Sequence, residues 1–293
     1  MIYISSAAVN SSSIKDSVSK LAGIGIRNIE LTGGTEYCAD ILTILKSYKE
    51  KYSLNFLIHN YFPPPQKDFV LNIASHNETT RLNSVNFVKR SINLAHDLEI
   101  DRYTLHPGYA RDFYPSSSDD YFMPDDSPGI SSGLAFTIML RSISMIKGYA
   151  EEKGVKIGLE NLFPTDDAPE SSLLCIPADI IQFLDYFDKD DNIGFLLDLG
   201  HLLISANYFG FNKDDLINTL SIKYQNKVFG IHLSGNDGKK DHHTLLSPDC
   251  WQLRAAQRFD LEKTPITIEC RKFNTKEIFK QYQMVKNILE REV

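Results

Sequence analysis

Side chains that commonly bind metal ions end six apolar, strand-like runs of this 293-residue chain. The runs are NFLIH, RYTLH, VKIGLE, NIGFLLD, VFGIH and TPITIE. In a barrel of parallel strands, the C-terminal strand ends meet over the pore, where such enzymes carry their chemistry. His, Asp and Glu without Cys favour a divalent ion such as zinc, manganese, cobalt or magnesium. The pattern predicts a metal-dependent active site whose potential ligands are His59, His106, Glu160, Asp198, His201, His232, Asp241, His243 and Glu269.

Two local spacings support this interpretation. In DLGH, Asp198 ends a strand and His201 lies one turn further on, so both can reach one site. In KDHH, Asp241 and His243 are two residues apart and share one side of an extended segment. A single strand-end histidine more often makes a structural hydrogen bond than binds a metal. The joint occurrence at six strand ends favours metal binding.

Short β-branched and aromatic runs alternate with longer segments of helical period. The runs are apolar on both faces, as expected of buried parallel strands. Eight strand–helix units predict a (β/α)8 TIM barrel, with one domain over residues 1–293, and a doubly wound open sheet is the alternative. The expected strands cover 2–7, 27–32, 55–59, 102–106, 155–160, 193–198, 228–233 and 265–270. The expected helices cover 13–23, 38–52, 79–98, 132–153, 177–188, 211–223, 248–258 and 275–291.

Two connections, at about 60–78 and 107–131, are too long to be plain turns. Both contain aromatic residues, and the first begins with the stiff stretch NYFPPPQ. Long loops at the C-terminal ends of barrel strands are usually functional. The alternative is that their aromatic residues simply pack the loops onto the barrel rim.

The composition is that of a globular protein with a large core, 42% hydrophobic and 24% charged. No stretch is long and apolar enough to span a bilayer, and the start of the chain does not resemble a signal peptide, so we expect a cytoplasmic protein without a membrane partner. The four cysteines form no CxxC pair and suit reduced thiols. A net charge of −7 removes any general electrostatic attraction to nucleic acid.

In their order along the chain, these motifs resemble the xylose isomerase-like TIM-barrel superfamily. That superfamily includes endonuclease IV and many sugar or sugar-phosphate isomerases and epimerases. The resemblance covers most of the chain, and its motifs are more specific to the superfamily than to any one activity. The matching segments are His59, HPG at 106–108, EN at 160–161, DLGH at 198–201, IHLSGNDG at 231–238, DHH at 241–243 and IEC at 268–270.

The resemblance implies two alternative sites. Endonuclease IV-like enzymes bind three zinc ions, and each of their ligand positions has a match here; their bridged metals produce a hydroxide that attacks a phosphoester. The ketose epimerase-like branch uses one ion, which stabilises an enediolate. Its ligands would be Glu160, Asp198, His232 and Glu269, the two glutamates would also move the proton, and His201 would contact the substrate.

The loop charges favour the second branch. An acidic rim repels the DNA backbone, which disfavours nucleic acid as a partner but leaves that alternative open. Segment 161–173 has three acidic residues and no basic one, and segment 107–133 sets five aspartates against Arg111. Those aspartates are Asp112, Asp119, Asp120, Asp125 and Asp126.

We therefore predict an isomerase or epimerase of a small sugar or sugar phosphate, dependent on one to three divalent ions, with zinc or manganese favoured. An endonuclease IV-like multinuclear zinc phosphoester hydrolase (AP endonuclease) is the alternative. A sugar-binding protein without catalysis is disfavoured because both glutamates and the ligand set are intact. The oligomeric state stays open. The residues expected to bind substrate are Tyr61, Asn161, Lys239 and Arg271.

Overall fold

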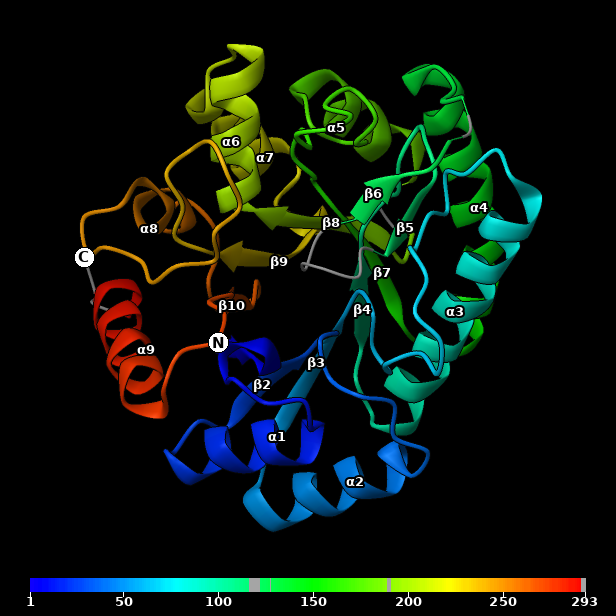
Figure 1. Ribbon diagram of the computed structural model, residues 1–293. Coiled ribbons are helices and arrows are strands. Elements are labelled where there is room, and N and C mark those ends of the chain that lie inside the picture. Colours follow the sequence, from blue (N-terminus) through cyan, green and yellow to red (C-terminus); the bar gives the residue numbers. More distant parts are fainter. Residues whose placement is uncertain (116–121, 127, 189–190, 291–293) are drawn as a thin grey trace.

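Parallel strands close into a barrel at the centre of the molecule (Figure 1). The computed structural model describes residues 1–115, 122–126, 128–188 and 191–290. The barrel strands are β1 (Ile2–Ser5), β2 (Asn28–Leu31), β3 (Asn55–His59), β4 (Arg102–Leu105), β7 (Lys156–Glu160), β8 (Ile193–Asp198), β9 (Val228–Leu233) and β10 (Ile266–Ile268). Within these residues the barrel order is β1-β10-β9-β8-β7-β4-β3-β2. The predicted TIM barrel is confirmed, and the open-sheet alternative is wrong.

Helices form a layer around the barrel (Figure 1). They are α1 (Ile14–Gly23), α2 (Ile41–Tyr52), α3 (Glu78–Asp97), α4 (Ser132–Glu152), α5 (Pro177–Tyr186), α6 (Leu199–Phe209), α7 (Lys213–Lys223), α8 (Trp251–Ala256) and α9 (Thr275–Leu289), with 3-10 turns η1 (Ser6–Ala8) and η2 (Gln225–Lys227). In the described part of the chain, none is long and apolar enough to cross a membrane. The outer layer follows the expected helices except for α6, which the sequence did not predict, and α8, which is shorter than expected.

Helix α6 follows β8 without any intervening loop. The Asp198 side chain caps it by accepting a hydrogen bond from the backbone N–H of His201 at 2.7 Å. Gly200 lies between them, where an added Cβ would collide with the Ser234 hydroxyl. The local sequence DLGH therefore turns a barrel strand directly into a helix at the mouth of the barrel.

The two long loops are packed together by aromatic side chains. The first has no helix or strand between β3 and α3. The second contains an antiparallel hairpin that the sequence did not predict, β5 (Phe113–Pro115) and β6 (Phe122–Pro124); residues 116–121 and 127 lie outside the described residues. The Phe113 ring lies 4.9 Å from that of Tyr109, and the Phe122 ring lies 6.0 Å from that of Tyr61. These contacts support the packing role over a free aromatic lid.

The buried carboxylate of Asp112, in the second loop, joins the two long loops through contacts with the first. Asp112 accepts hydrogen bonds from Asn72 Nδ2 and Ser75 Oγ, both at 2.8 Å. The Asn72 side-chain oxygen accepts from the Tyr109 backbone N–H at 2.9 Å. Gly108 has φ +100°, and a Cβ there would collide with that oxygen. Because Asp112 is only 6% exposed, counting it in an acidic rim was wrong. Asp119 and Asp120 lie outside the described residues.

We predict that Asp112→Ala lowers the free energy of unfolding by about 1–3 kcal/mol, because Asn72 and Ser75 each lose their shortest hydrogen bond, which goes to a buried charged acceptor, and keep only longer ones to backbone carbonyls. Urea unfolding of the metal-free protein measures the change. Asp126→Ala, an exposed position of the same loop, is the matched control and should change stability by less than about 0.5 kcal/mol. Equal effects of the two substitutions would contradict the anchoring role.

Candidate metal centre

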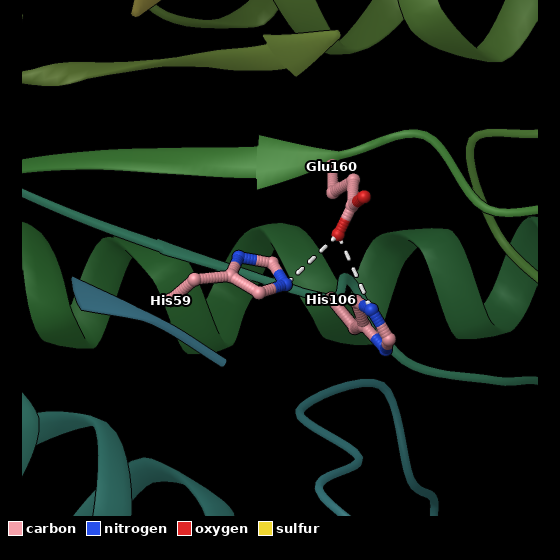
Figure 2. A group of neighbouring side chains, drawn as sticks. All are labelled: His59, His106 and Glu160. Carbon is pink, nitrogen blue, oxygen red and sulfur yellow. Dashed lines mark ion pairs between the residues drawn. The ribbon is translucent and has the colours of Figure 1, made fainter. Parts of the chain in front are cut away.

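The carboxylate of Glu160, at the end of β7, is the centre of a histidine cluster at the barrel mouth. His59 Nε2 and His106 Nε2 lie 3.3 and 3.2 Å from Oε2. Figure 2 shows both imidazole rings directed at this carboxylate. His201 Nδ1 and His232 Nδ1 lie 3.4 and 3.6 Å from Oε1. Glu160 is 1% exposed, and neither of its carboxylate oxygens has a hydrogen-bond partner among the described residues. A buried carboxylate with four imidazoles around it and no hydrogen-bond donor is typical of a metal ligand.

A second group shares Glu160 and adds two more carboxylates. The ligand atoms of Glu160, Asp198, His232 and Glu269 all lie within 4.8 Å of one another. His232 Nδ1 is 3.4 Å from Glu269 Oε2 and 3.9 Å from Asp198 Oδ2. The two carboxylate oxygens of Asp198 differ in their contacts. Oδ1 caps α6, whereas Oδ2 has no hydrogen-bond partner in the described structure. Three carboxylates and one imidazole form a suitable set for a hard or borderline divalent ion.

A third group adjoins the first two. Asp241 Oδ2 lies 2.6 Å from His243 Nε2 and 3.6 Å from His201 Nε2. His243 Nδ1 in turn lies 3.6 Å from Glu269 Oε2. His243 has φ +46°, a strained backbone conformation that in proteins is concentrated at functional sites. The structure thus brings together all nine residues that the sequence proposed as ligands.

Three of the histidines have one ring nitrogen fixed by a neutral protein oxygen. Backbone carbonyl oxygens only accept, so Nδ1 of His201 and of His243 must carry the proton, whereas the Thr104 hydroxyl beside His59 can donate or accept. In His201 and His243 the other nitrogen, Nε2, then has a lone pair available for a metal, an arrangement typical of metal-ligating histidines. The three contacts are His59 Nδ1 with Thr104 Oγ1 at 3.0 Å, His201 Nδ1 with the Asn161 carbonyl at 2.9 Å, and His243 Nδ1 with the Glu269 carbonyl at 2.9 Å.

Burial and crowding shift the acidities of the cluster. Burial raises the pKa of Asp198 to about 7; the charges of Glu160 and Glu269 act in the same direction, and that of His201 opposes them. Burial also lowers the pKa of His59 to about 4, against the attraction of Glu160. A divalent ion would relieve both effects, because it stabilises charged carboxylates and neutral imidazoles.

The fit to a cation also rests on polar atoms that the protein leaves unsatisfied. Asp198 Oδ2, His232 Nδ1 and Asp241 Oδ1 are buried and have no hydrogen-bond partner among the described residues. Such orphaned groups are costly unless something satisfies them. They all belong to the groups described above, so the residues present fit a bound divalent metal.

Two residues expected to bind substrate are engaged with the protein itself. The Tyr61 hydroxyl accepts a hydrogen bond from the Leu71 N–H at 2.7 Å, within the first long loop. The Asn161 side chain donates to the Asp198 carbonyl at 2.9 Å and accepts from its N–H at 2.8 Å. Asn161 therefore fixes the end of β8.

The other two are exposed at the barrel mouth. Lys239 lies in the loop after β9, and Arg271 follows Glu269 by two residues. The neighbouring Lys240 forms an ion pair of 3.1 Å with Asp166, which joins this loop to the one after β7. Substrate binding by Lys239 and Arg271 stays a prediction.

Sequence reasoning missed two residues of this region. Glu30, on β2, is 2% exposed and lies 3.0 Å from His232 Nε2 through Oε1. The sequence does mark Glu30, because RNIELT is another apolar run that contains one carboxylate. Unlike the other runs, it continues past the carboxylate with Leu31. The Phe163 ring packs 4.7 Å from that of His201. Nothing in its sequence context marks Phe163.

Comparison with known proteins identifies the same type of barrel. The family described as "Xylose isomerase-like TIM barrel" matches residues 18–281. Two uncharacterized proteins of Methanocaldococcus jannaschii, MJ1311 and MJ1614, are 26% and 25% identical over 72% and 70% of this chain. The matched regions span only 61% and 64% of those two relatives.

Solved structures share the fold at low sequence identity. A D-tagatose 3-epimerase-like protein has a TM-score of 0.73 at 22% identity, covering 99% of this chain and 97% of its own. A putative xylose isomerase from Rhodospirillum rubrum has a TM-score of 0.69 at 14% identity, and the match covers 100% of this chain and 99% of that protein. D-psicose 3-epimerase from Clostridium cellulolyticum H10, solved with D-tagatose, has a TM-score of 0.65 at 13% identity. The match covers 98% of this chain and 95% of that protein.

We predict that zinc or manganese raises the thermal unfolding temperature of chelator-treated protein. At a free metal concentration of about 100 times Kd, binding to the folded state alone adds about 2.7 kcal/mol. Glu160→Gln should abolish most of this gain, because Glu160 belongs to two of the groups. His76→Gln, at an exposed histidine, should retain it. A metal response that survives Glu160→Gln would contradict the assignment of the centre.

Proposed function

The chain belongs to the xylose isomerase-like TIM barrel family, and from that premise and the geometry of its barrel mouth we propose that it is a divalent-metal-dependent isomerase or epimerase of small sugars or sugar phosphates. Solved structures with this fold are described as a D-psicose 3-epimerase, a D-tagatose 3-epimerase-like protein and a putative xylose isomerase. That likeness supports the substrate class, and the argument for the reaction comes from the site.

The observation that carries the proposal is the placement of two glutamates around one histidine nitrogen. Glu160 Oε1 and Glu269 Oε2 lie 3.6 and 3.4 Å from His232 Nδ1. Glu160 ends β7 and Glu269 follows β10, with β8 and β9 between them in the barrel. The two carboxylates therefore approach the same small volume from different directions. An epimerase requires such a pair, because one group removes a proton and another returns it from the other face.

The residues suited to hold the ion are Glu160, Asp198, His232 and Glu269. When bound, a divalent ion supplies a Lewis acid that stabilises the negative charge of an enediolate. One glutamate carboxylate accepts the proton from the carbon next to the substrate carbonyl, and the other, protonated, donates one to the opposite face of that carbon. Phe163, beside His201, would limit water access to that side of the mouth.

The exposed cations of the mouth support a small charged substrate. Lys239 and Arg271 lie in the loops after β9 and β10, close to the ligands in sequence. Either could hold a phosphate or carboxylate group of the sugar, which Arg does with bidentate geometry. This is the basis for including sugar phosphates in the proposed substrate class.

A second candidate is a multinuclear zinc phosphoester hydrolase. It is favoured by the third group, in which Asp241 lies beside both His201 and His243. A mechanism with one ion needs only the four ligands Glu160, Asp198, His232 and Glu269. In that mechanism the third group would bind no metal. The two candidates therefore differ in the number of ions per chain.

We predict one tightly bound ion per chain, manganese, cobalt, magnesium or zinc, in protein purified without chelators or added metal. Elemental analysis against protein concentration measures the ratio. Two or three zinc ions per chain would favour the hydrolase, and abasic-site DNA and small phosphoesters would then be the substrates to assay.

We predict that a ketose or ketose phosphate accepted by the protein incorporates deuterium from D2O at the carbon next to its carbonyl. Glu269→Gln should lower this exchange at least about 100-fold, because amides do not take up protons near neutral pH. NMR spectroscopy of the recovered sugar measures the exchange. Glu262→Gln, an exposed glutamate before β10, is the matched control and should exchange like the wild type. Unchanged exchange in Glu269→Gln would contradict its role in proton transfer.

A further inference from the structure

Glu30 forms a buried pair with His232 on the side of the imidazole that faces away from the ligand carboxylates. His232 Nε2 lies 3.0 Å from Glu30 Oε1 and 3.2 Å from Oε2. The Thr267 hydroxyl donates to Oε2 at 3.1 Å and helps to hold the carboxylate. Glu30 and His232 are 2% and 0% exposed. The contact is therefore shielded from water, where a charged hydrogen bond has its greatest effect.

This contact determines which nitrogen of His232 is available to a metal. An ionised carboxylate only accepts hydrogen bonds, so Nε2 carries the proton. The lone pair then lies on Nδ1, the nitrogen that faces Glu160 and Glu269 at 3.6 and 3.4 Å. The opposite tautomer would place a lone pair against the Glu30 carboxylate and a proton where a metal would bind.

Glu30 also differs in charge from the groups that contact Nδ1 of His59, His201 and His243 at the shortest distance. His59, His201 and His243 are oriented by a hydroxyl or a backbone carbonyl. Among the described residues these contacts are neutral, whereas His232, the one imidazole of the four-ligand group, faces a carboxylate. A carboxylate behind a metal-binding imidazole makes the ring a stronger donor.

Glu30 acts through the ring and does not join the ligands. The imidazole stands between it and the other carboxylates, since Nε2 faces Glu30 while Nδ1 faces Glu160, Asp198 and Glu269. None of the candidate metal-binding groups found among the described residues includes Glu30.

We propose that Glu30 is a positioning residue that fixes the His232 tautomer and strengthens it as a metal ligand. The inference rests on the proposed metal centre and holds for either proposed reaction. Glu30, the third residue of β2, would therefore affect metal affinity although it does not bind the metal itself.

The test measures cobalt affinity by competition with a chromophoric chelator, together with the visible absorption spectrum of the bound cobalt. Glu30→Gln and Glu30→Leu should each bind cobalt about 10-fold to 100-fold more weakly than the wild type. Glu30→Leu should show the larger loss, because the Gln oxygen still accepts from Nε2. Thr267→Val, which removes a hydrogen bond to Glu30 but keeps its charge, is the matched control and should stay within about 3-fold of the wild type.

Nitrogen-15 NMR spectra of the zinc-loaded proteins provide a readout that loss of packing would not move. His232 should carry its proton on Nε2 in the wild type and in Glu30→Gln, and should lose this fixed tautomer in Glu30→Leu. Circular dichroism of the chelator-treated variants checks that each is folded. Wild-type cobalt affinity and an unchanged spectrum in both Glu30 variants would overturn the inference alone. Failure of the wild-type chain to bind cobalt would overturn the proposed metal-dependent function together with it.

Discussion

The buried carboxylate of Glu160 imposes the constraint that the rest of the site satisfies. It lies within 3.6 Å of four imidazoles and is almost fully screened from water. Asp198 and Glu269 are buried in the same volume. Like charges this close destabilise one another strongly in a medium of low dielectric constant. The fold holds them together because short parallel strands end at the mouth and leave the side chains little freedom to separate.

The pairing register of the barrel strands places the candidate ligands next to the groups that orient them. Cα pairing places His59 opposite Thr104 on β3 and β4, and these side chains form a hydrogen bond. It also places His232 opposite Asp198 on one side and opposite Thr267 on the other. In a closed barrel a one-residue shift would turn these side chains to the other face. The hydrogen-bonded register that stabilises the barrel therefore also determines the geometry of the centre.

The clustering of the nine candidate ligand residues could be predicted from sequence because each ends or follows an apolar run, and parallel strands must bring those ends together. Helix α6 could not, because LGHLLISANYF is apolar on most sides and continues the apolar strand without a turn residue. The hairpin in the second loop depends on contacts with distant aromatic residues such as Tyr61. Glu30 was missed because its strand continues past it, and its partner is a histidine 202 residues away.

The candidate metal ligands alone do not identify the reaction, because one fold hosts many reactions. The charge around the barrel mouth distinguishes the two proposed substrates better. Binding duplex DNA requires several Lys or Arg contacts to phosphates, each displacing a counterion. In the described loops of the mouth, Lys240 is paired with Asp166, and the Arg111 guanidinium donates to the Asp125 carbonyl. In the proposed function, the exposed Lys239 and Arg271 would hold one phosphate group of a small molecule. The nine candidate ligands are compatible with either proposed reaction, and the shortage of positive charge in the described loops favours the proposed sugar substrate over DNA.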